Sequence, residues 1–282
     1  MRAIQDQLIS TGMELAVQQI DAPVAKREHL ERVHDPDYVT GIFTEAPYEG
    51  IFRIDSDTFM MSKTLDAALR AAGAVVHAVD LVMTGQCKAA FCAVRPPGHH
   101  AERHRAMGFC YFNNIAVGAA HALEVYGLDR VSFIYFDVHH VNGTEDIFQE
   151  DPRVMFCSSF QHPFYPFTGH ETETDHVINI PLHAGADGAE FRKQVEAHWL
   201  PALEHFKPQL VMISAGFDAH AEDDMGQLRL RESDYDWVTT QLKDIADKYA
   251  EGRIISALEG GYVLGALARS VMAHLDALLG HR

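Results

Sequence analysis

The sequence predicts an α/β fold in which one mainly parallel sheet carries helices on both faces. Short apolar segments recur along the chain, and most are separated by segments with apolar residues at helical spacing. Such alternation favours a parallel sheet, because each helix returns the chain to the same end of the next strand. The 282 residues contain no linker, repeat or low-complexity stretch. Residues 1–282 are therefore expected to form a single domain.

The first third of the chain is expected to be mostly helical. Residues 2–15 have the spacing of an amphipathic helix, and residues 28–43 that of short helices joined by an Asp-Pro turn. Residues 54–58 are expected to form a polar loop that contains two carboxylates. A long helix rich in alanine, valine and leucine is predicted over 64–83.

Six apolar segments are predicted to be strands. The segment 131–136 is the clearest, because its β-branched, aromatic and small residues carry no charge and suit a strand buried on both faces. Two prolines follow the segment that ends at Val94, and they prevent it from continuing as helix or ladder. The six predicted strands are 89–94, 131–136, 154–158, 177–181, 210–214 and 254–258.

Helices are predicted between these strands and after the last of them. Asp187 is expected to cap a helix that runs to about residue 206. Ser233 is expected to cap another helix, with Asp236 placed as in a capping box. The predicted helices are 114–126, 145–149, 187–206, 233–249 and a C-terminal helix that ends near residue 279.

The composition argues against several classes of protein. A formal net charge of −17 argues against nucleic-acid binding, although an acidic surface can attract cationic partners. No apolar run is long enough to cross a bilayer, and the first residues do not resemble a signal peptide. The four cysteines lack the C-x-x-C spacing of a zinc knuckle and are expected to be reduced. We therefore expect a cytoplasmic protein that binds neither nucleic acid nor membrane.

Polar residues collect where four of the predicted strands end. Asp137 and His139 project from the same side of an extended segment, about 7 Å apart along the strand. Taken alone, this pair fits half of a metal site and a core histidine beside a turn equally well. Open parallel sheets bind ligands beyond the carboxyl ends of their strands, so four clusters at one edge favour a functional site. The clusters are Gly98-His99-His100, Asp137-Val138-His139-His140, Asp218-Ala219-His220 and Glu259-Gly260-Gly261-Tyr262.

The residue types in these clusters suit metal-assisted hydrolysis of an amide. The carboxylates of Asp137 and Asp218 and the imidazole of His139 match a catalytic zinc site, which keeps one position open. Water bound at that position loses a proton near neutral pH and can then attack a carbonyl. Two histidines could transfer protons, and a tyrosine behind two glycines could donate a hydrogen bond to the developing oxyanion: His99, His100 and Tyr262.

The motifs around these clusters resemble those of the zinc-dependent histone deacetylases, especially their bacterial class II-like members. They follow the family's order and span most of the chain, and as a set they are highly specific. The resemblance implies the arginase/deacetylase fold, with the zinc ligands and catalytic residues named above. The matching motifs are RPPGHHA (95–101), GFCYFNN (108–114), DVHH (137–140), SAGFDAH (214–220) and LEGGY (258–262).

The resemblance also implies a tunnel that receives an acyl-lysine side chain. Two aromatic residues would form its walls, a methionine would lie at its rim, and an aspartate would hold the substrate backbone. From the residues alone, ordinary core packing is the preferred explanation of the two aromatic residues and the methionine. The implied substrate-binding residues are Asp57, Gly108, Phe109, Tyr165, Met225 and Gly261.

Three departures from the family bear on activity. Tyr135 stands where the family has an Asp that helps to bind a monovalent cation and accepts a hydrogen bond from the first histidine of the pair. A potassium site that used Asp137, His139 and Ser158 is therefore expected to be altered. Val141 stands where the family has Gly. The chain also begins at a helix where relatives have an earlier strand, so the N-terminal strand of the family is expected to be missing.

The resemblance predicts a zinc-dependent amidohydrolase that removes acetyl or other acyl groups from N-acyl-lysine side chains. The alternatives are an acetylpolyamine deacetylase and an acyl-lysine binding protein whose catalysis is weakened by Tyr135 and Val141. A two-metal ureohydrolase of the same fold is excluded, because Val141 cannot ligate a metal. The expected partner is an acetyl-lysine protein or a small acylated amine, and an oligomer is compatible with the sequence.

Overall fold

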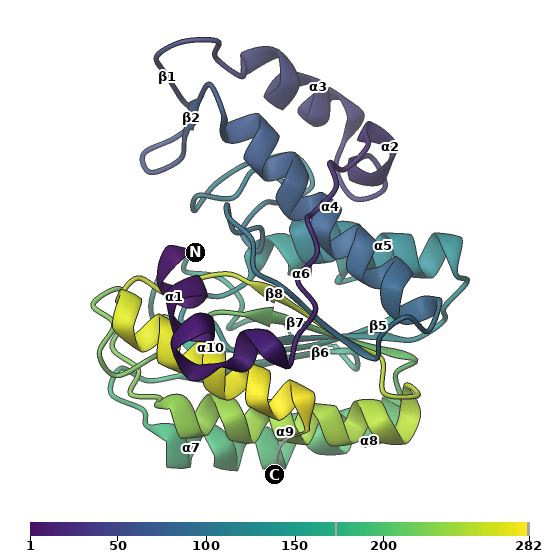
Figure 1. Cartoon of the computed structure of the whole chain (residues 1–282), viewed down its shortest axis with the longest axis vertical. Helices are drawn as coiled ribbons and strands as arrows, with labels where there is room; N and C mark the ends of the chain where they lie inside the picture. Colours follow the sequence, from purple (N-terminus) through teal and green to yellow (C-terminus); the bar gives the residue numbers. More distant parts are fainter. Residues whose placement is uncertain (173, 281–282) are drawn as a thin grey trace.

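A parallel sheet of six strands lies at the centre of the computed structural model, which describes residues 1–172 and 174–280 (Figure 1). The strands are β3 (Ala89–Cys92), β4 (Val131–Tyr135), β5 (Val154–Gln161), β6 (Val177–Leu182), β7 (Leu210–Ala215) and β8 (Ile254–Leu258). Their spatial order is β3-β8-β7-β4-β5-β6, and all neighbours in it are parallel. The predicted fold class is therefore confirmed.

The uncharged strand β4 lies inside the sheet, between β7 and β5. Its side chains alternate between two hydrophobic cores, one on each face of the sheet. Phe133 and Tyr135 belong to the first core, and Ile134 and Phe136 to the second. All five residues of β4 are buried. Burial on both faces explains why this stretch of sequence shows no alternation of apolar and polar residues.

Helices cover both faces of the sheet (Figure 1). On one face α4 (Thr64–Met83) packs against α5 (Asn114–Val125), and on the other α9 (Glu232–Tyr249) packs against α10 (Leu264–Leu279). The first helix, α1 (Arg2–Thr11), lies against α10. Over the part of the chain that the structure describes, no helix combines the length and the apolar character that a membrane span requires.

The segment between α1 and α4 forms a small layer beyond α4 (Figure 1). It contains the predicted Asp-Pro turn, where Asp35 caps a helix by accepting the N–H of Asp37. The polar loop predicted over 54–58 proves to be the turn of a β-hairpin, whose two short strands the sequence analysis did not predict. The elements of this layer are α2 (Arg27–Leu30), α3 (Pro36–Glu45), β1 (Ile51–Arg53) and β2 (Phe59–Met61).

Two predicted helices are interrupted. The helix predicted over 2–15 ends at Thr11, because Gly12 adopts a left-handed conformation with φ 74° and a short 3₁₀ turn follows. The helix predicted over 187–206 begins after Asp187, which accepts two backbone N–H groups as expected of a cap. A π-helical stretch then divides it into α7 (Gly188–Gln194), the π segment (Val195–Trp199) and α8 (Leu200–Phe206).

The cap predicted for α9 at Ser233 is wrong by two residues, because the residue that caps the helix is Arg231. The helix begins at Glu232, so Ser233 lies inside it. Asp234 accepts the N–H of Arg231 at 2.9 Å and takes the place predicted for Asp236. Asp234 also pairs with the guanidinium of Arg192, and this ion pair helps to fix the start of the helix.

Candidate metal and proton-transfer site

The four polar clusters lie at one edge of the sheet. Strand β8 inserts between β3 and β7, and β7 is followed by β4, so these four strands are consecutive. Because all four are parallel, their carboxyl ends deliver the residues that follow them to the same region. The strand order therefore brings together segments that are more than a hundred residues apart in the sequence, His99 and Glu259 among them.

Asp137, His139 and Asp218 form a buried group with the chemistry of metal ligands. The Nδ1 atom of His139 lies 3.0 Å from Asp137 Oδ1 and 3.3 Å from Asp218 Oδ2. Asp218 Oδ1 accepts the N–H of Val138. Apart from the His139 contact, Asp218 Oδ2 has no partner within residues 1–172 and 174–280. The structure thus brings the three predicted zinc ligands together, with one oxygen left for a cation.

The charges of this group favour a bound cation. Burial raises the pKa of Asp218, and the charge of Asp137 adds to this effect, to about 6. Burial alone would lower the pKa of His139, but hydrogen bonds with the two carboxylates raise it to about 10. A proton on His139 therefore balances the carboxylates in the metal-free protein. Zinc can replace this proton, and two carboxylates with one imidazole fit an open zinc site.

Two glycines allow the strand ends to approach these carboxylates. A Cβ at Gly216 would lie 2.0 Å from Asp137 Oδ2, and a Cβ at Gly260 would lie 2.1 Å from Asp218 Oδ2. Both distances are far below van der Waals contact, so an alanine at either position would displace a carboxylate. The N–H of Gly260 also donates to Asp137 Oδ2 at 3.1 Å. The glycines of the SAGFDAH and LEGGY motifs thus have a steric function.

Asn142 and Glu102 fix the protonation pattern of His100. Asn142 Nδ2 donates to the carboxylate of Glu102 at 2.6 Å, so the Oδ1 atom of Asn142 faces His100. That oxygen lies 2.7 Å from His100 Nδ1, which must therefore carry the hydrogen. In the neutral ring the Nε2 atom is then free to accept a proton. The sequence analysis assigned no role to Asn142 or Glu102.

His99 lacks the partner that His100 has. Its Nδ1 atom has no hydrogen-bond partner in the described part of the chain, and the nearest carboxylate oxygen, Asp137 Oδ2, is 3.7 Å away. The rings of His99 and His100 lie 4.0 Å apart. Burial, and then the neighbouring histidines, hold the pKa of each well below its usual value. Both rings are therefore neutral at physiological pH in the metal-free protein.

Tyr135 is a core residue here and makes no ion pair. Its ring packs 5.0 Å from that of Phe156 and 6.0 Å from that of Phe133. Its buried hydroxyl has no hydrogen-bond partner among the residues described, and the same holds for the hydroxyl of Ser158, its neighbour in the sheet. Val141 is also buried, and its φ of −89° lies outside the left-handed region that would favour glycine.

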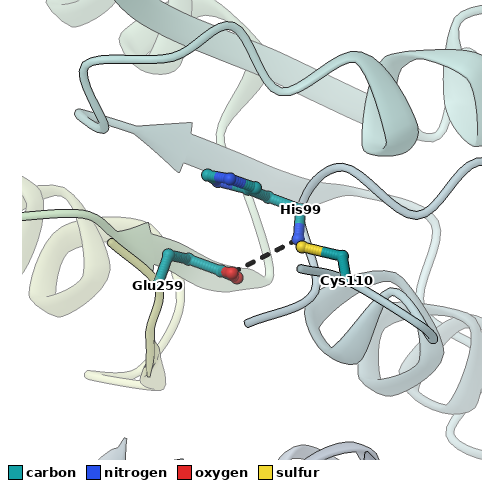
Figure 2. A group of neighbouring side chains, drawn as sticks. All are labelled: His99, Cys110 and Glu259. Carbon is teal, nitrogen blue, oxygen red and sulfur yellow. Dashed lines mark hydrogen bonds between the residues drawn. The ribbon is translucent and has the colours of Figure 1, made fainter. Parts of the chain in front are cut away.

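Glu259 anchors the turn that carries His99 (Figure 2). Its Oε2 atom accepts the N–H of Gly98 at 2.7 Å and of His99 at 3.2 Å, and its Oε1 atom accepts the hydroxyl of Ser214 at 2.7 Å. Cys110 lies beside this pair, and its thiol donates to the carbonyl of Gly108. The group His99, Cys110 and Glu259 has residue types that bind metals. Because its carboxylate already accepts three hydrogen bonds, we assign it a structural role.

The residues predicted to line the tunnel gather around the histidines. The ring of Tyr165 lies 5.2 Å from that of His100, and the ring of Phe109 lies 6.4 Å from that of Tyr262. Phe109 has a left-handed φ of 67°, and its N–H donates to the hydroxyl of Thr58. Phe109, Tyr262 and Met225 all stay partly exposed, at 36%, 40% and 38%. These three side chains are therefore accessible to a substrate rather than ordinary core residues.

The remaining predicted substrate residues are Asp57, Gly108 and Gly261. The hydroxyl of Thr58 donates to Asp57, which links the carboxylate to the loop of Phe109. A Cβ at Gly108 would lie 2.3 Å from the ring of His100. Gly261 has a φ of 138°, which only glycine adopts readily. Gly108 thus lies against His100 and Gly261 directly precedes Tyr262, whereas Asp57 is connected to the site through Thr58 and the loop of Phe109.

Comparison with known proteins gives a consistent result. The profile of the histone deacetylase domain matches residues 1–278. Type-2 histone deacetylase 2 of Dictyostelium discoideum is 40% identical over 273 residues, which cover 89% of this chain and 16% of that protein. Polyamine deacetylase HDAC10 of Homo sapiens is 34% identical over 298 residues, which cover 99% of this chain and 44% of that protein. The chain thus spans less than half the length of these two relatives.

A solved structure shows the same architecture. The HD domain of HDA15 superposes with a TM-score of 0.93 at 33% sequence identity. The match covers 99% of this chain and 81% of that chain. The likeness therefore includes all four strand ends that build the candidate site.

Proposed function

Because the chain belongs to the histone deacetylase domain family, we propose that it is a zinc-dependent amidohydrolase that removes acetyl or other acyl groups from N-acyl-lysine side chains. Family membership and the names of the relatives support deacetylase activity, and hence a hydrolase. The observation that carries the proposal is the convergence of Asp137, His139 and Asp218 beside two neutral histidines and a partly exposed tyrosine.

Zinc held by the two aspartates and His139 would supply Lewis-acid chemistry, which activates water and polarises the amide carbonyl. His100 Nε2 is free to take the proton that water loses on attack, because Nδ1 is committed to Asn142. The leaving amine requires a proton, and either histidine of the pair can return it. The hydroxyl of Tyr262 donates to the carbonyl oxygen as negative charge develops there. Burial, and then the two aspartates, raise the pKa of Tyr262, so the phenol keeps its proton.

The rim favours acyl-lysine over acetylpolyamine. A polyamine carries a second ammonium group, which an acidic residue at the rim would bind. Met225, the residue that we propose for the rim, is partly exposed and offers an apolar surface without charge. Acetylpolyamine remains the second candidate substrate, because HDAC10, a relative named as a polyamine deacetylase, matches over 99% of this chain. The acidic net charge would also attract polyamines over a longer range.

The decisive experiment combines metal analysis with a panel of acetyl-lysine peptides, longer acyl-lysine peptides and acetylpolyamines. We expect one zinc per chain, turnover of acyl-lysine that a chelator abolishes, and a lower kcat/KM on acetylputrescine. Asp218→Ala should lose the zinc. Full zinc occupancy in this variant would contradict the ligand assignment, and higher kcat/KM on acetylpolyamine would reverse the substrate assignment. A protein that binds acyl-lysine without turnover would instead be the weakened binding protein considered above.

A further inference from the structure

Asp223 lies in the loop after β7 and is nearly fully buried, with 6% of its surface exposed. Three backbone N–H groups donate to its carboxylate. Met225 donates to Oδ1 at 3.0 Å, while Tyr262 and Val263 donate to Oδ2 at 2.7 Å and 3.1 Å. One side chain therefore holds two segments that are about 40 residues apart in the sequence. The first segment carries the rim residue, and the second carries the tyrosine of the site.

Tyr262 depends on such an anchor more than the other residues of the site do. It follows Gly260 and Gly261, and glycine, which lacks a Cβ, restricts the backbone little at the φ of 138° that Gly261 adopts. Tyr262 is 40% exposed, so packing holds it less tightly than the fully buried residues of the site. Val263, the next residue, precedes the first turn of α10, where unpaired N–H groups favour an anion. The Asp223 carboxylate satisfies the backbone on both sides of the Tyr262 side chain.

We propose that Asp223 is the positioning residue for Tyr262, and that it couples the tyrosine to the rim segment of Met225. The inference rests on the proposed function, in which Tyr262 donates a hydrogen bond to the substrate carbonyl. Asp223 does not reach the reacting atoms itself. It acts by fixing the backbone from which the phenol projects. A displacement of about 1 Å in such a group costs roughly 10²-fold in rate.

The chemistry of the anchor makes a sharp test possible. Both oxygens of Asp223 accept N–H groups, so an amide in the same place must turn its own NH₂ toward at least one donor. Asp223→Asn therefore keeps the size of the side chain but breaks the arrangement. Asp224 is the adjacent residue and is exposed, so Asp224→Asn removes the same charge without touching the anchor.

The first measurement is a double-mutant cycle on the zinc-loaded full chain. We expect Asp223→Asn to lower kcat by roughly 10- to 100-fold with zinc content unchanged, and Asp224→Asn to have no effect. In the background of Tyr262→Phe, Asp223→Asn should lower kcat by less than about 3-fold, because the group that it positions is already absent. Losses that multiply would show that Asp223 does not act through Tyr262. An unchanged kcat in the single variant would overturn the proposal.

Amide hydrogen exchange gives a second measurement that does not depend on activity. The amides of Tyr262 and Val263 should exchange faster in Asp223→Asn than in Asp224→Asn, and equal exchange would overturn the proposal. If Asp223→Asn does not fold, Asp223→Glu keeps the charge, displaces the carboxylate and enters the same cycle. Failure of the proposed function can be told apart from failure of this proposal. In the first case the unaltered protein shows no turnover, and the exchange measurement still tests whether Asp223 holds the backbone of Tyr262.

Discussion

The two neighbouring histidines of the site are held in different ways. The His100 ring has a fixed hydrogen on Nδ1 because an amide oxygen faces it, and the orientation of that amide is set by Glu102. The His99 ring has no such partner, and its position depends on the backbone bond to Glu259. A proton acceptor needs a defined tautomer. His100 is therefore the better candidate for the base, and His99 for a group that assists it.

At the residue scale, Tyr262→Phe tests the role of the phenol. We expect the variant to keep its zinc and to lose roughly 10²–10³-fold in kcat, the usual effect of removing one oxyanion donor. The measurement is steady-state turnover of an acetyl-lysine peptide together with metal analysis. An unchanged rate would remove Tyr262 from the mechanism.

Tyr135 allows a second prediction at the residue scale. Tyr135→Phe removes a buried hydroxyl that has Thr144 nearby but makes no well-formed hydrogen bond in the described structure, so stability should stay equal or rise by up to about 1–3 kcal/mol. Tyr135→Asp would restore the carboxylate that the family uses beside the first histidine. We expect a higher kcat but a lower unfolding midpoint, because the substitution removes an aromatic ring from between Phe133 and Phe156.

Denaturant unfolding and steady-state kinetics on the same samples separate the two effects of Tyr135. Tyr135→Phe serves as the control for kcat, since it restores no carboxylate. If Tyr135→Asp left kcat unchanged, the missing carboxylate would not limit catalysis. In that case the family resemblance would overstate the importance of position 135.

The grouping of Asp137, His139 and Asp218, the proposed zinc ligands, was predictable from the sequence, whereas the residues that support the candidate site were not. The strand ends near Asp137 and Gly260 can be recognised in the sequence, because a run of apolar residues stops there and polar residues or glycines follow. Asp223 cannot be recognised in this way, because it is one of three consecutive acidic residues, and the sequence around Asn142, the first residue of a helix, does not indicate its partners. Their partners lie about 40 residues away in each case, and only the fold brings them together. Glu259 belongs to a motif that the sequence analysis identified. That its carboxylate accepts the N–H groups of Gly98 and His99 could not be predicted, because the fold determines where that turn lies.

At the scale of elements, the helices show which glycines are required by packing. Gly41 lies inside α3, and a Cβ there would meet no heavy atom of the described residues within 4 Å. Gly73 lies inside α4, and a Cβ there would lie 2.0 Å from the carbonyl oxygen of Pro23. Both glycines have an ordinary helical φ, so replacement by alanine should raise the helix propensity equally at both positions. The two positions differ only in the space available for a Cβ atom.

Gly41→Ala should therefore stabilise the protein by about 0.5–1 kcal/mol, the usual difference between the two residues in a helix. Gly73→Ala should destabilise it by at least about 1–3 kcal/mol, because the segment at Pro23 must move away from α4. Urea unfolding of the two variants measures both values. A stable Gly73→Ala variant would mean that the Pro23 segment does not lie against α4 in solution.

Element boundaries were less predictable than element types. The sequence predicts one helix over 187–206, and the chain is helical there throughout, but the π-helical stretch depends on packing that no local pattern reveals. The cap of α9 was misplaced for a similar reason. Asp234 pairs with Arg192, a residue from another helix, and this contact outweighs the local preference for Ser233. The hairpin of β1 and β2 was missed because each strand has only three residues.

At the scale of the whole molecule, buried histidines predict how stability depends on pH. Burial holds the pKa of His274 at about 3 and that of His34 at about 4. The unfolded chain binds protons at these positions below about pH 6.5, whereas the folded chain does not. Their contribution to stability is therefore complete above pH 6.5 and is lost as pH falls toward 3 to 4. At pH 5 each group has lost about 2 kcal/mol of its contribution.

Urea unfolding of the metal-free protein at pH 7.5 and pH 5 tests this prediction. His274→Gln removes one of the buried neutral histidines, while His34, His99 and His100 remain, so the loss of stability between these pH values should shrink by about 2 kcal/mol. His205 is exposed on α8, and His205→Gln should leave the loss unchanged. If all three proteins lost the same amount, His274 would not contribute to acid unfolding.

The strand order also determines when the sheet can be completed during synthesis. Ribosomes release the chain from its N-terminus, and β3 is made about 160 residues before β8, its partner in the sheet. Until β8 emerges, β3 has no ladder partner in the described structure, and one edge of β7 is unpaired. Unpaired edges promote association between nascent chains. The segment that begins with β8 also carries Glu259 and Tyr262. A chain that stalls before residue 254 would therefore lack both one strand of the sheet and part of the candidate site.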